Sequence, residues 1–259
     1  MIAEGPPILE RNGSIATIRL RRPSQRNSLQ DVDLRTMLAY FDEVNADRSI
    51  RVLVVSADTL GQARPVFSAG YDVAGFDSGA HDPQLFEKVP DAIETLRPIT
   101  VCALTGSVYG GATDLLLACD VRVAVAGSVF RMPAVALGLH YYPSGLRRYV
   151  TRLGLNTAKR AFLTAQPIPV EQLQQQTGLF HQIVGPPAFN GVVHELTVAM
   201  AALAPLAAEL TKQSLKEIAE GSFDASALRS RETTTLSSSD FAEGRAAFAA
   251  KRVPHFKGH

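Results

Sequence analysis

The sequence predicts an α/β fold followed by a C-terminal third made of helices. Short apolar segments typical of strands alternate with helical segments along the first two-thirds of the 259-residue chain. From about residue 190 onward, apolar side chains recur at helical spacing in Ala-rich sequence, and strand patterns stop. A hydrophobic content of 46% with 20% charged residues supports a sizeable core and excludes a disordered chain. We therefore expect a core domain over residues 1–190 and a helical, oligomerising subdomain over residues 191–259.

The chain begins with a predicted β-hairpin. The pair Asn12-Gly13 separates two apolar alternations, over residues 8–10 and 15–20. An Asn-Gly pair in such a setting is a strong signal for two antiparallel strands joined by a tight turn. Pro23 then ends the second strand.

The following elements are expected from periodicity, capping residues and breakers. The run over 52–56 is β-branched, which suits a strand buried on both faces, and Pro98 marks the end of a helix. The expected elements are a helix from about Leu29 to Asn45 capped by Asn27 or Ser28, strands over 52–56 and 66–70, a helix over 83–96, a strand over 99–104, a turn over 105–111, a helix over 111–118, a strand over 121–125 and a helix over 241–250.

Charge and cysteine content narrow the function classes. A formal net charge of +1 argues against nucleic acid as the main partner. Cys102 and Cys119 lie in apolar runs and have no metal-like spacing, so we expect buried thiols and neither a disulfide framework nor a metal site. No secretory signal and no bilayer-spanning run is visible, and we expect a soluble, cytoplasmic protein.

The segment over residues 106–114, GSVYGGATD, is the most informative part of the sequence. Gly110 and Gly111 stand between a buried strand and a helix, where the backbone turns sharply and a ligand can approach main-chain N–H groups. Such N–H groups at a helix start favour a developing negative charge, and Asp114 follows three residues later on the same face. The pattern therefore fits a site that binds an oxyanion and moves a proton beside it. A plain tight turn with a helix-capping Asp explains the same residues.

A second loop of small residues ends another predicted strand. It reads Phe67-Ser68-Ala69-Gly70-Tyr71-Asp72 and offers a further backbone N–H to a bulky ligand. An ordinary loop is the alternative. Taken together, the two loops supply the two converging donors that a thioester enolate requires.

At this point the sequence resembles the enoyl-CoA hydratase/isomerase (crotonase) superfamily over almost its whole length. Separated motifs carry the resemblance in the right order, and they cover residues 21–29, 66–72, 106–120, 130–133, 137–139 and 248–257. The resemblance implies a spiral of ββα units that binds acyl-CoA as a homotrimer or hexamer. It also implies that coenzyme A enters only as part of the thioester substrate, with no other cofactor.

The resemblance also implies roles for individual residues. The backbone amides of Tyr71 and Gly111 would hold the thioester oxygen. The loop at Ala69 and Asp72 would receive the CoA adenine, and Arg26 would lie near the CoA phosphates.

Two residues of the tail match family positions that reach the nucleotide end of CoA, often across a subunit interface. These are Phe248 and Lys251. Core packing is the alternative for Phe248, and a solvated surface charge is the alternative for Lys251 and for Arg26.

The chain departs from the hydratases of this superfamily at the acid/base positions. Hydratases use two glutamates that flank a water molecule. The first position is Asp114 here, and the second, after Pro133, is Ala134, which has no titratable group. Addition of water by two carboxylates is therefore in doubt, although a single acid/base can still move a proton on an enolate. We expect Asp114→Asn to abolish turnover and to leave CoA binding intact.

The loop after Gly138 is also unusual, because it carries three polar aromatic residues, His140, Tyr141 and Tyr142. This loop resembles that of methylmalonyl-CoA decarboxylases in the same superfamily, which lack the second glutamate and carry a tyrosine at the position of Tyr141. His140 and Tyr141 are candidate proton donors. Alternatively, the aromatics only fill the pocket and set the acyl-chain length.

Three functions remain in competition. A hydratase or isomerase is favoured by the whole-chain resemblance and by Asp114. A malonyl- or methylmalonyl-CoA decarboxylase is favoured by Ala134 and the aromatic loop, and a non-catalytic acyl-CoA binder by the missing second glutamate. A side chain from residues 140–142 that points at Asp114 would favour the decarboxylase, whereas an open wall there would favour the hydratase.

Overall fold

The computed structural model describes residues 3–72, 82 and 84–259. Its strands form two sheets. The larger sheet has the order β1-β2-β3-β5-β7-β10, and the smaller sheet has the order β4-β6-β8-β9. The strands are β1 (Gly5–Asn12), β2 (Ile15–Arg21), β3 (Val52–Ala57), β4 (Val66–Ser68), β5 (Ile99–Leu104), β6 (Ser107–Tyr109), β7 (Val121–Val125), β8 (Val129–Arg131), β9 (Ile168–Pro169) and β10 (Gln182–Val184).

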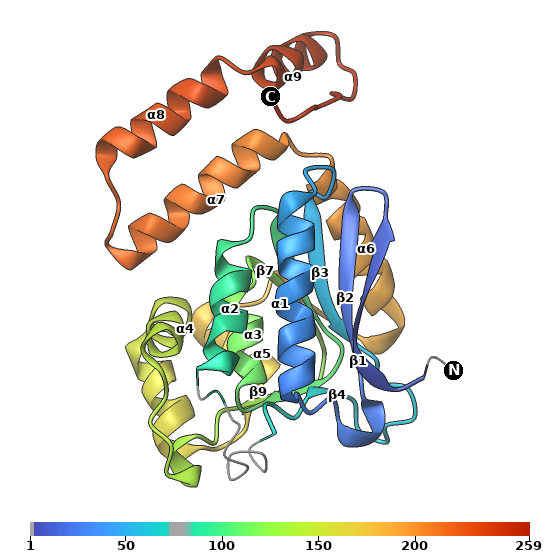
Figure 1. Ribbon diagram of the computed structural model, residues 1–259, viewed down its shortest axis with the longest axis vertical. Coiled ribbons are helices and arrows are strands. Elements are labelled where there is room, and N and C mark those ends of the chain that lie inside the picture. Colours follow the sequence, from blue (N-terminus) through green and yellow to red (C-terminus); the bar gives the residue numbers. More distant parts are fainter. Residues whose placement is uncertain (1–2, 73–81, 83) are drawn as a thin grey trace.

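Nine α-helices accompany the sheets in the described part of the chain (Figure 1). They are α1 (Asp31–Ala46), α2 (Leu85–Thr95), α3 (Ala112–Ala118), α4 (Pro143–Thr164), α5 (Val170–Thr177), α6 (Pro186–Ala201), α7 (Pro205–Glu220), α8 (Ala225–Leu236) and α9 (Ser239–Ala249). None of the described helices by itself is long and apolar enough to cross a membrane; α6 and α7 meet that length and hydropathy only when combined across the 103° bend between them.

The predicted hairpin and the predicted ββα spiral are confirmed. Strands β1 and β2 pair antiparallel, and the remaining neighbours in the larger sheet pair parallel. The succession strand–strand–helix recurs as β3-β4-α2, β5-β6-α3 and β7-β8-α4. In each unit the first strand joins the larger sheet and the second joins the smaller one, so the chain winds through both sheets.

One expected element is wrong. The turn expected over residues 105–111 contains β6, which pairs parallel with β4 and with β8. A three-residue strand beside glycines has little periodicity of its own. Its partners are distant in sequence, so only the tertiary fold reveals it.

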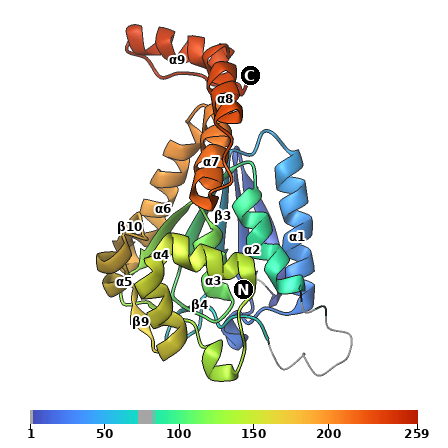
Figure 2. The same ribbon diagram turned by 90° about the vertical axis from the view of Figure 1, so that its left-hand side faces the viewer.

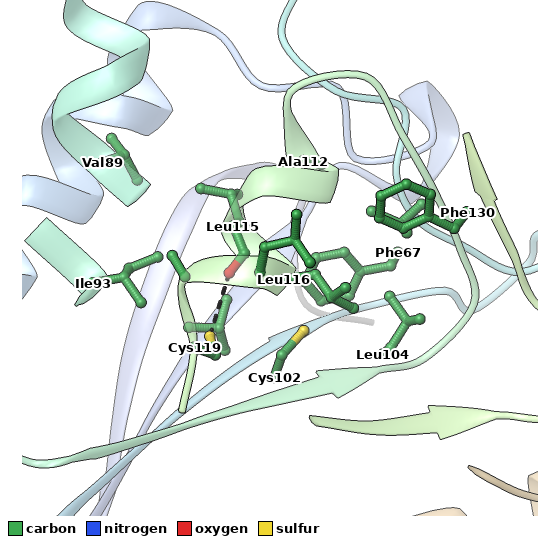
Figure 3. Close-up of a cluster of buried hydrophobic side chains, with 14 of the residues drawn as sticks. Phe67, Val89, Ile93, Cys102, Leu104, Ala112, Leu115, Leu116, Cys119 and Phe130 are labelled. Carbon is green, nitrogen blue, oxygen red and sulfur yellow. Dashed lines mark hydrogen bonds between the residues drawn. The ribbon is translucent and has the colours of Figure 1, made fainter. Parts of the chain in front are cut away.

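The core lies between the larger sheet and helices α1, α2 and α3. All seven residues of α3 are buried, and Figure 3 shows its leucines packed against β5 and α2. Cys102 and Cys119 lie in this cluster as free, buried thiols, and the Cys119 thiol donates to the Leu115 carbonyl at 3.4 Å.

The division expected at residue 190 falls inside α6, and α6 belongs to the body. Phe189 of α6 is buried, and it packs with Val54, Val101 and Val123 on the second face of the larger sheet. A helix can cover a sheet only by burying an apolar stripe, and α6 carries one. Helix α7 contacts the body through Lys212, which pairs with Asp120 at 2.6 Å and donates to the Pro98 carbonyl at 2.9 Å, and α8 and α9 project beyond it (Figures 1 and 2).

Candidate active site

The ends of three parallel strands assemble the site. Val66 pairs with Ser107 and Ser68 with Val108, which aligns β4 with β6. Val108 in turn pairs with Phe130, which aligns β6 with β8. Because parallel strands end at the same edge of a sheet, the loops that follow β4, β6 and β8 meet there.

The loops after β4 and β6 are in direct contact. Gly70 has a φ of +95°, and a Cβ added to it would lie 2.8 Å from the Tyr109 carbonyl oxygen and 3.2 Å from the Gly111 nitrogen. Glycine is therefore required at position 70, both for its backbone conformation and for this close approach.

The predicted amide donors both belong to these touching loops. Leu29 and Tyr71 form a parallel bridge, in which the Leu29 amide donates to the Gly70 carbonyl at 2.9 Å and the Asp72 amide donates to the Leu29 carbonyl at 2.8 Å. This pattern directs the Tyr71 amide to the side opposite Leu29. Gly111 is the N-cap of α3, so its amide comes before the first hydrogen bond of that helix.

The residues expected at the CoA end share the same region. The Ala69 amide donates to the Arg26 carbonyl at 2.8 Å, and the side chains of Arg26 and Asp72 are exposed. The structure thus brings Arg26, Ala69 and Asp72 to the loops that carry Tyr71.

Asn27 organises this region and does not cap a helix. Helix α1 begins at Asp31 with Gln30 as its N-cap. Asn27 is 1% exposed, donates its side-chain amide to the Asp58 carbonyl at 2.8 Å, and accepts at its own carbonyl from the Ser68 hydroxyl at 2.7 Å. A buried amide with these partners fastens the segment after β2 to strand β4.

The structure does not bring Phe248 and Lys251 to the site within one chain. Phe248 lies in α9 and is 88% exposed, and Lys251 follows that helix. Figures 1 and 2 place α9 at the end of the molecule opposite to β4. A contact of these residues with CoA across a subunit interface remains a prediction.

Asp114 lies in the first turn of α3 and is 0% exposed. Its Oδ1 accepts from Arg148 Nε at 2.9 Å and its Oδ2 accepts from Arg148 Nη2 at 2.8 Å. Arg148 is also fully buried, and its Nη1 donates to Asp91 at 2.6 Å and to Glu94 at 3.1 Å. Such a two-pronged contact fixes both the orientation and the charge of a carboxylate.

Burial and charge shift the pKa values of this pair. Burial raises the pKa of Asp114, while the hydrogen bonds and the positive charge of Arg148 oppose that rise. Burial also lowers the pKa of Arg148, but the hydrogen bonds and the charge of Asp114 outweigh it and raise the pKa overall. Arg148 therefore stays a fixed cation beside Asp114.

Tyr142 is the aromatic residue that reaches Asp114. Its hydroxyl donates to Asp114 Oδ2 and accepts from the hydroxyl of Tyr141 at 3.1 Å. Burial, followed by the charge of Asp114, raises the pKa of Tyr142, and burial also raises that of Tyr141. Both tyrosines therefore remain neutral hydroxyl groups.

The other two positions of this region differ from Tyr142. His140 is exposed, in contrast to Tyr141, which is buried. Ala134, at the position of the second glutamate, is 3% exposed. The aromatic loop thus supplies a hydrogen-bond donor to Asp114, and position 134 supplies no acid or base.

Two residues of the site escaped sequence reasoning. Arg148 lies three residues after Gly145 in α4, one helical turn along, and Gly145, Arg148 and its neighbour Tyr149 are all buried. A signal did exist, since an arginine on an apolar helix face requires an acidic partner. Phe86 was missed because its helix lies far from the glycine loop in sequence, although its ring packs on Gly111.

The described residues contain no group of three His, Cys, Asp or Glu side chains that could hold a metal.

The whole chain is similar to acyl-CoA enzymes. It is 30% identical to the 2,3-dehydroadipyl-CoA hydratase of Escherichia coli over 97% of this chain and 98% of that protein. It is 25% identical to the methylmalonyl-CoA decarboxylase of the same organism over 95% of both chains. Among solved structures, it superimposes with a TM-score of 0.90 on an enoyl-CoA hydratase/carnithine racemase from Magnetospirillum magneticum, at 26% identity over 99% of this chain and 97% of that one. The sequence model of the family described as enoyl-CoA hydratase/isomerase matches residues 10–259. The chain therefore belongs to the enoyl-CoA hydratase/isomerase family.

Proposed function

We propose that this protein removes CO₂ from a 2-carboxyacyl-CoA thioester of the malonyl-CoA or methylmalonyl-CoA class. The observation that carries the proposal is that Asp114 is buried and that both of its carboxylate oxygens already accept hydrogen bonds. Its two oxygens accept from Arg148 and Tyr142, and its side chain is 0% exposed. A carboxylate held in this way is poorly suited to activate water or to take a proton from a substrate.

Decarboxylation requires no base. The bond between the α-carbon and the carboxylate carbon breaks, and CO₂ leaves. The electron pair passes into the thioester as an enolate, whose oxygen we assign to the amides of Tyr71 and Gly111. The N-terminus of α3 adds a favourable dipole at that point.

The enolate must then receive one proton at the α-carbon. We assign this transfer to Tyr142, whose hydroxyl proton turns from Asp114 and moves to the α-carbon. Tyr141, which already donates to the Tyr142 oxygen, passes its own proton to that oxygen, and water then returns a proton to Tyr141. Tyr142 is partly exposed whereas Asp114 is fully buried. The network therefore meets a ligand through tyrosine hydroxyls, with Asp114 and Arg148 as their anchor.

Hydration or isomerisation of an enoyl-CoA is the second candidate. It is favoured by the 30% identity with a 2,3-dehydroadipyl-CoA hydratase and by the acid at position 114. Burial also raises the pKa of Asp114, which makes this carboxylate a stronger base as long as it stays buried. Ala134 argues against hydration, because water addition by two carboxylates requires a second carboxylate and position 134 has none.

One set of assays separates the candidates. Release of CO₂ from malonyl-CoA and methylmalonyl-CoA is measured beside the hydration of crotonyl-CoA, with the same purified protein. CO₂ release without hydration supports the proposal, and hydration without CO₂ release refutes it.

A third reading, a non-catalytic binder, predicts a distinct result in these assays. It predicts binding of CoA thioesters with no turnover and no exchange of α-protons into deuterated water. Exchange of α-protons in an unreactive thioester would exclude the binder, because exchange requires the enolate to form.

A further inference from the structure

Phe86 lies directly against the backbone of one predicted amide donor. It is the second residue of α2, and it is 8% exposed. A Cβ added to Gly111 would lie 2.5 Å from the tip of the Phe86 ring. The ring therefore packs on the Cα of Gly111 and occupies the space that a side chain would need there.

The same ring connects both sides of the site. Its centroid is 5.6 Å from that of Tyr71 and 6.2 Å from that of Tyr142. Tyr142 in turn contacts Tyr141 at a centroid distance of 4.2 Å. The described residues thus form an aromatic wall that runs from the first donor loop, past Gly111, to the hydroxyl network of Asp114.

We take the acyl group of a thioester to run along this wall, because the Phe86 ring lies directly against Gly111, whose amide we assign to the thioester carbonyl. Buried aromatic rings in mutual contact give way only at a cost, because interiors are close-packed. Phe86 alone among these rings is apolar and has no hydrogen bond to hold it, so it contributes by volume only.

We propose that Phe86 determines acyl-group specificity in this protein by limiting the length of the acyl chain, so that a chain longer than a butyryl group gains no affinity. This inference rests on the proposed position of the thioester carbonyl between the Tyr71 and Gly111 amides. It does not depend on which bond the enzyme breaks.

The experiment measures binding of saturated CoA thioesters, which none of the candidate reactions consumes. Dissociation constants of acetyl-, butyryl- and octanoyl-CoA are determined by calorimetry for the wild type, Phe86→Ala and Phe86→Leu. Phe189→Leu is the matched control, because Phe189 is a buried phenylalanine on the far face of the larger sheet. Thermal unfolding verifies that each variant is folded.

A methylene that gains burial strengthens binding by about fourfold. We expect the wild type and Phe189→Leu to bind octanoyl-CoA no more tightly than butyryl-CoA. Phe86→Ala should bind octanoyl-CoA at least tenfold more tightly than butyryl-CoA, with Phe86→Leu in between. If Phe86→Ala does not fold, Phe86→Leu and the wild-type series decide the question.

Two results would overturn the inference. The first is a wild type that binds octanoyl-CoA tenfold more tightly than butyryl-CoA, and the second is a Phe86 variant whose chain-length series equals that of the wild type. A wild type that binds octanoyl-CoA no more tightly than butyryl-CoA but releases no CO₂ would refute the proposed reaction and leave the role of Phe86 standing. CO₂ release by a wild type that binds octanoyl-CoA tenfold more tightly than butyryl-CoA would support the proposed reaction and refute the role of Phe86.

Discussion

Replacing Asp114 by asparagine tests whether this residue anchors the site or acts as its base. The substitution removes the negative charge that faces Arg148 and leaves that fully buried guanidinium with Glu94 at 3.1 Å and Asp91 at 2.6 Å. Breaking a buried ion pair from one side costs about 3–5 kcal/mol. Because Arg148 keeps two acidic partners, we expect the lower end, about 3 kcal/mol. For a chain of this size that is a fall of roughly 6–12 °C in Tm.

The assay combines thermal and denaturant unfolding with turnover. Asp120→Asn is the matched control, because Asp120 flanks the opposite end of α3 and its side chain is 27% exposed beside Lys212. For Asp120→Asn we expect the free energy of unfolding to fall by about 1 kcal/mol. The double variant Asp114→Asn/Arg148→Met should recover part of the stability, since it removes both buried charges.

Turnover distinguishes the two roles of Asp114. The abolished turnover expected from the sequence assumed that Asp114 is the acid/base. If Asp114 instead anchors Tyr142, Asp114→Asn should lower CO₂ release by less than about 100-fold, whereas loss of a general base costs about 10²–10⁴-fold. A stability loss below about 1 kcal/mol in Asp114→Asn would refute the reasoning, because it would mean that the buried ion pair is not formed in solution.

Three further predictions follow from the same geometry. Tyr142→Phe should lower kcat for CO₂ release more than Tyr141→Phe does, since only Tyr142 donates to Asp114; equal effects in steady-state assays would contradict this order. Burial raises the pKa of Tyr142 above the ordinary value of about 10, so above that pH the unfolded chain loses a proton that the native state keeps, and stability falls. Denaturant unfolding should therefore show a decline in stability between pH 9 and pH 11 that is smaller by about 1.4 kcal/mol in total in Tyr142→Phe; equal declines would contradict it. The family resemblance implies a trimer or hexamer, in which the 88% exposed Phe248 would be covered by a partner subunit; light scattering should therefore give three or six times the chain mass, and a monomer would contradict this prediction.

Local sequence was sufficient for the elements whose signal lies within a few residues. The hairpin at Asn12-Gly13 and the buried strand over 52–56 follow from turn chemistry and from β-branched composition. The junction at Gly110-Gly111 follows in the same way, because glycine readily adopts the positive φ of 54° that Gly110 has in the turn between β6 and α3. Strand β6 was not predictable, because three residues carry no periodicity and its partners β4 and β8 lie elsewhere in the chain.

The sequence by itself determined the hairpin, the strands β3, β5 and β7, the two glycine-bearing loops and the acid at position 114, because each is written in neighbouring residues. Only the tertiary structure decided that Tyr142, and not His140 or Tyr141, meets Asp114, and that Arg148, 34 residues away, holds it. The physical reason is that local sequence does not set the direction in which a side chain points. A side chain's partner depends on how its helix or loop is rotated in the packed core, and that rotation is set by contacts between segments that the order of residues does not bring together.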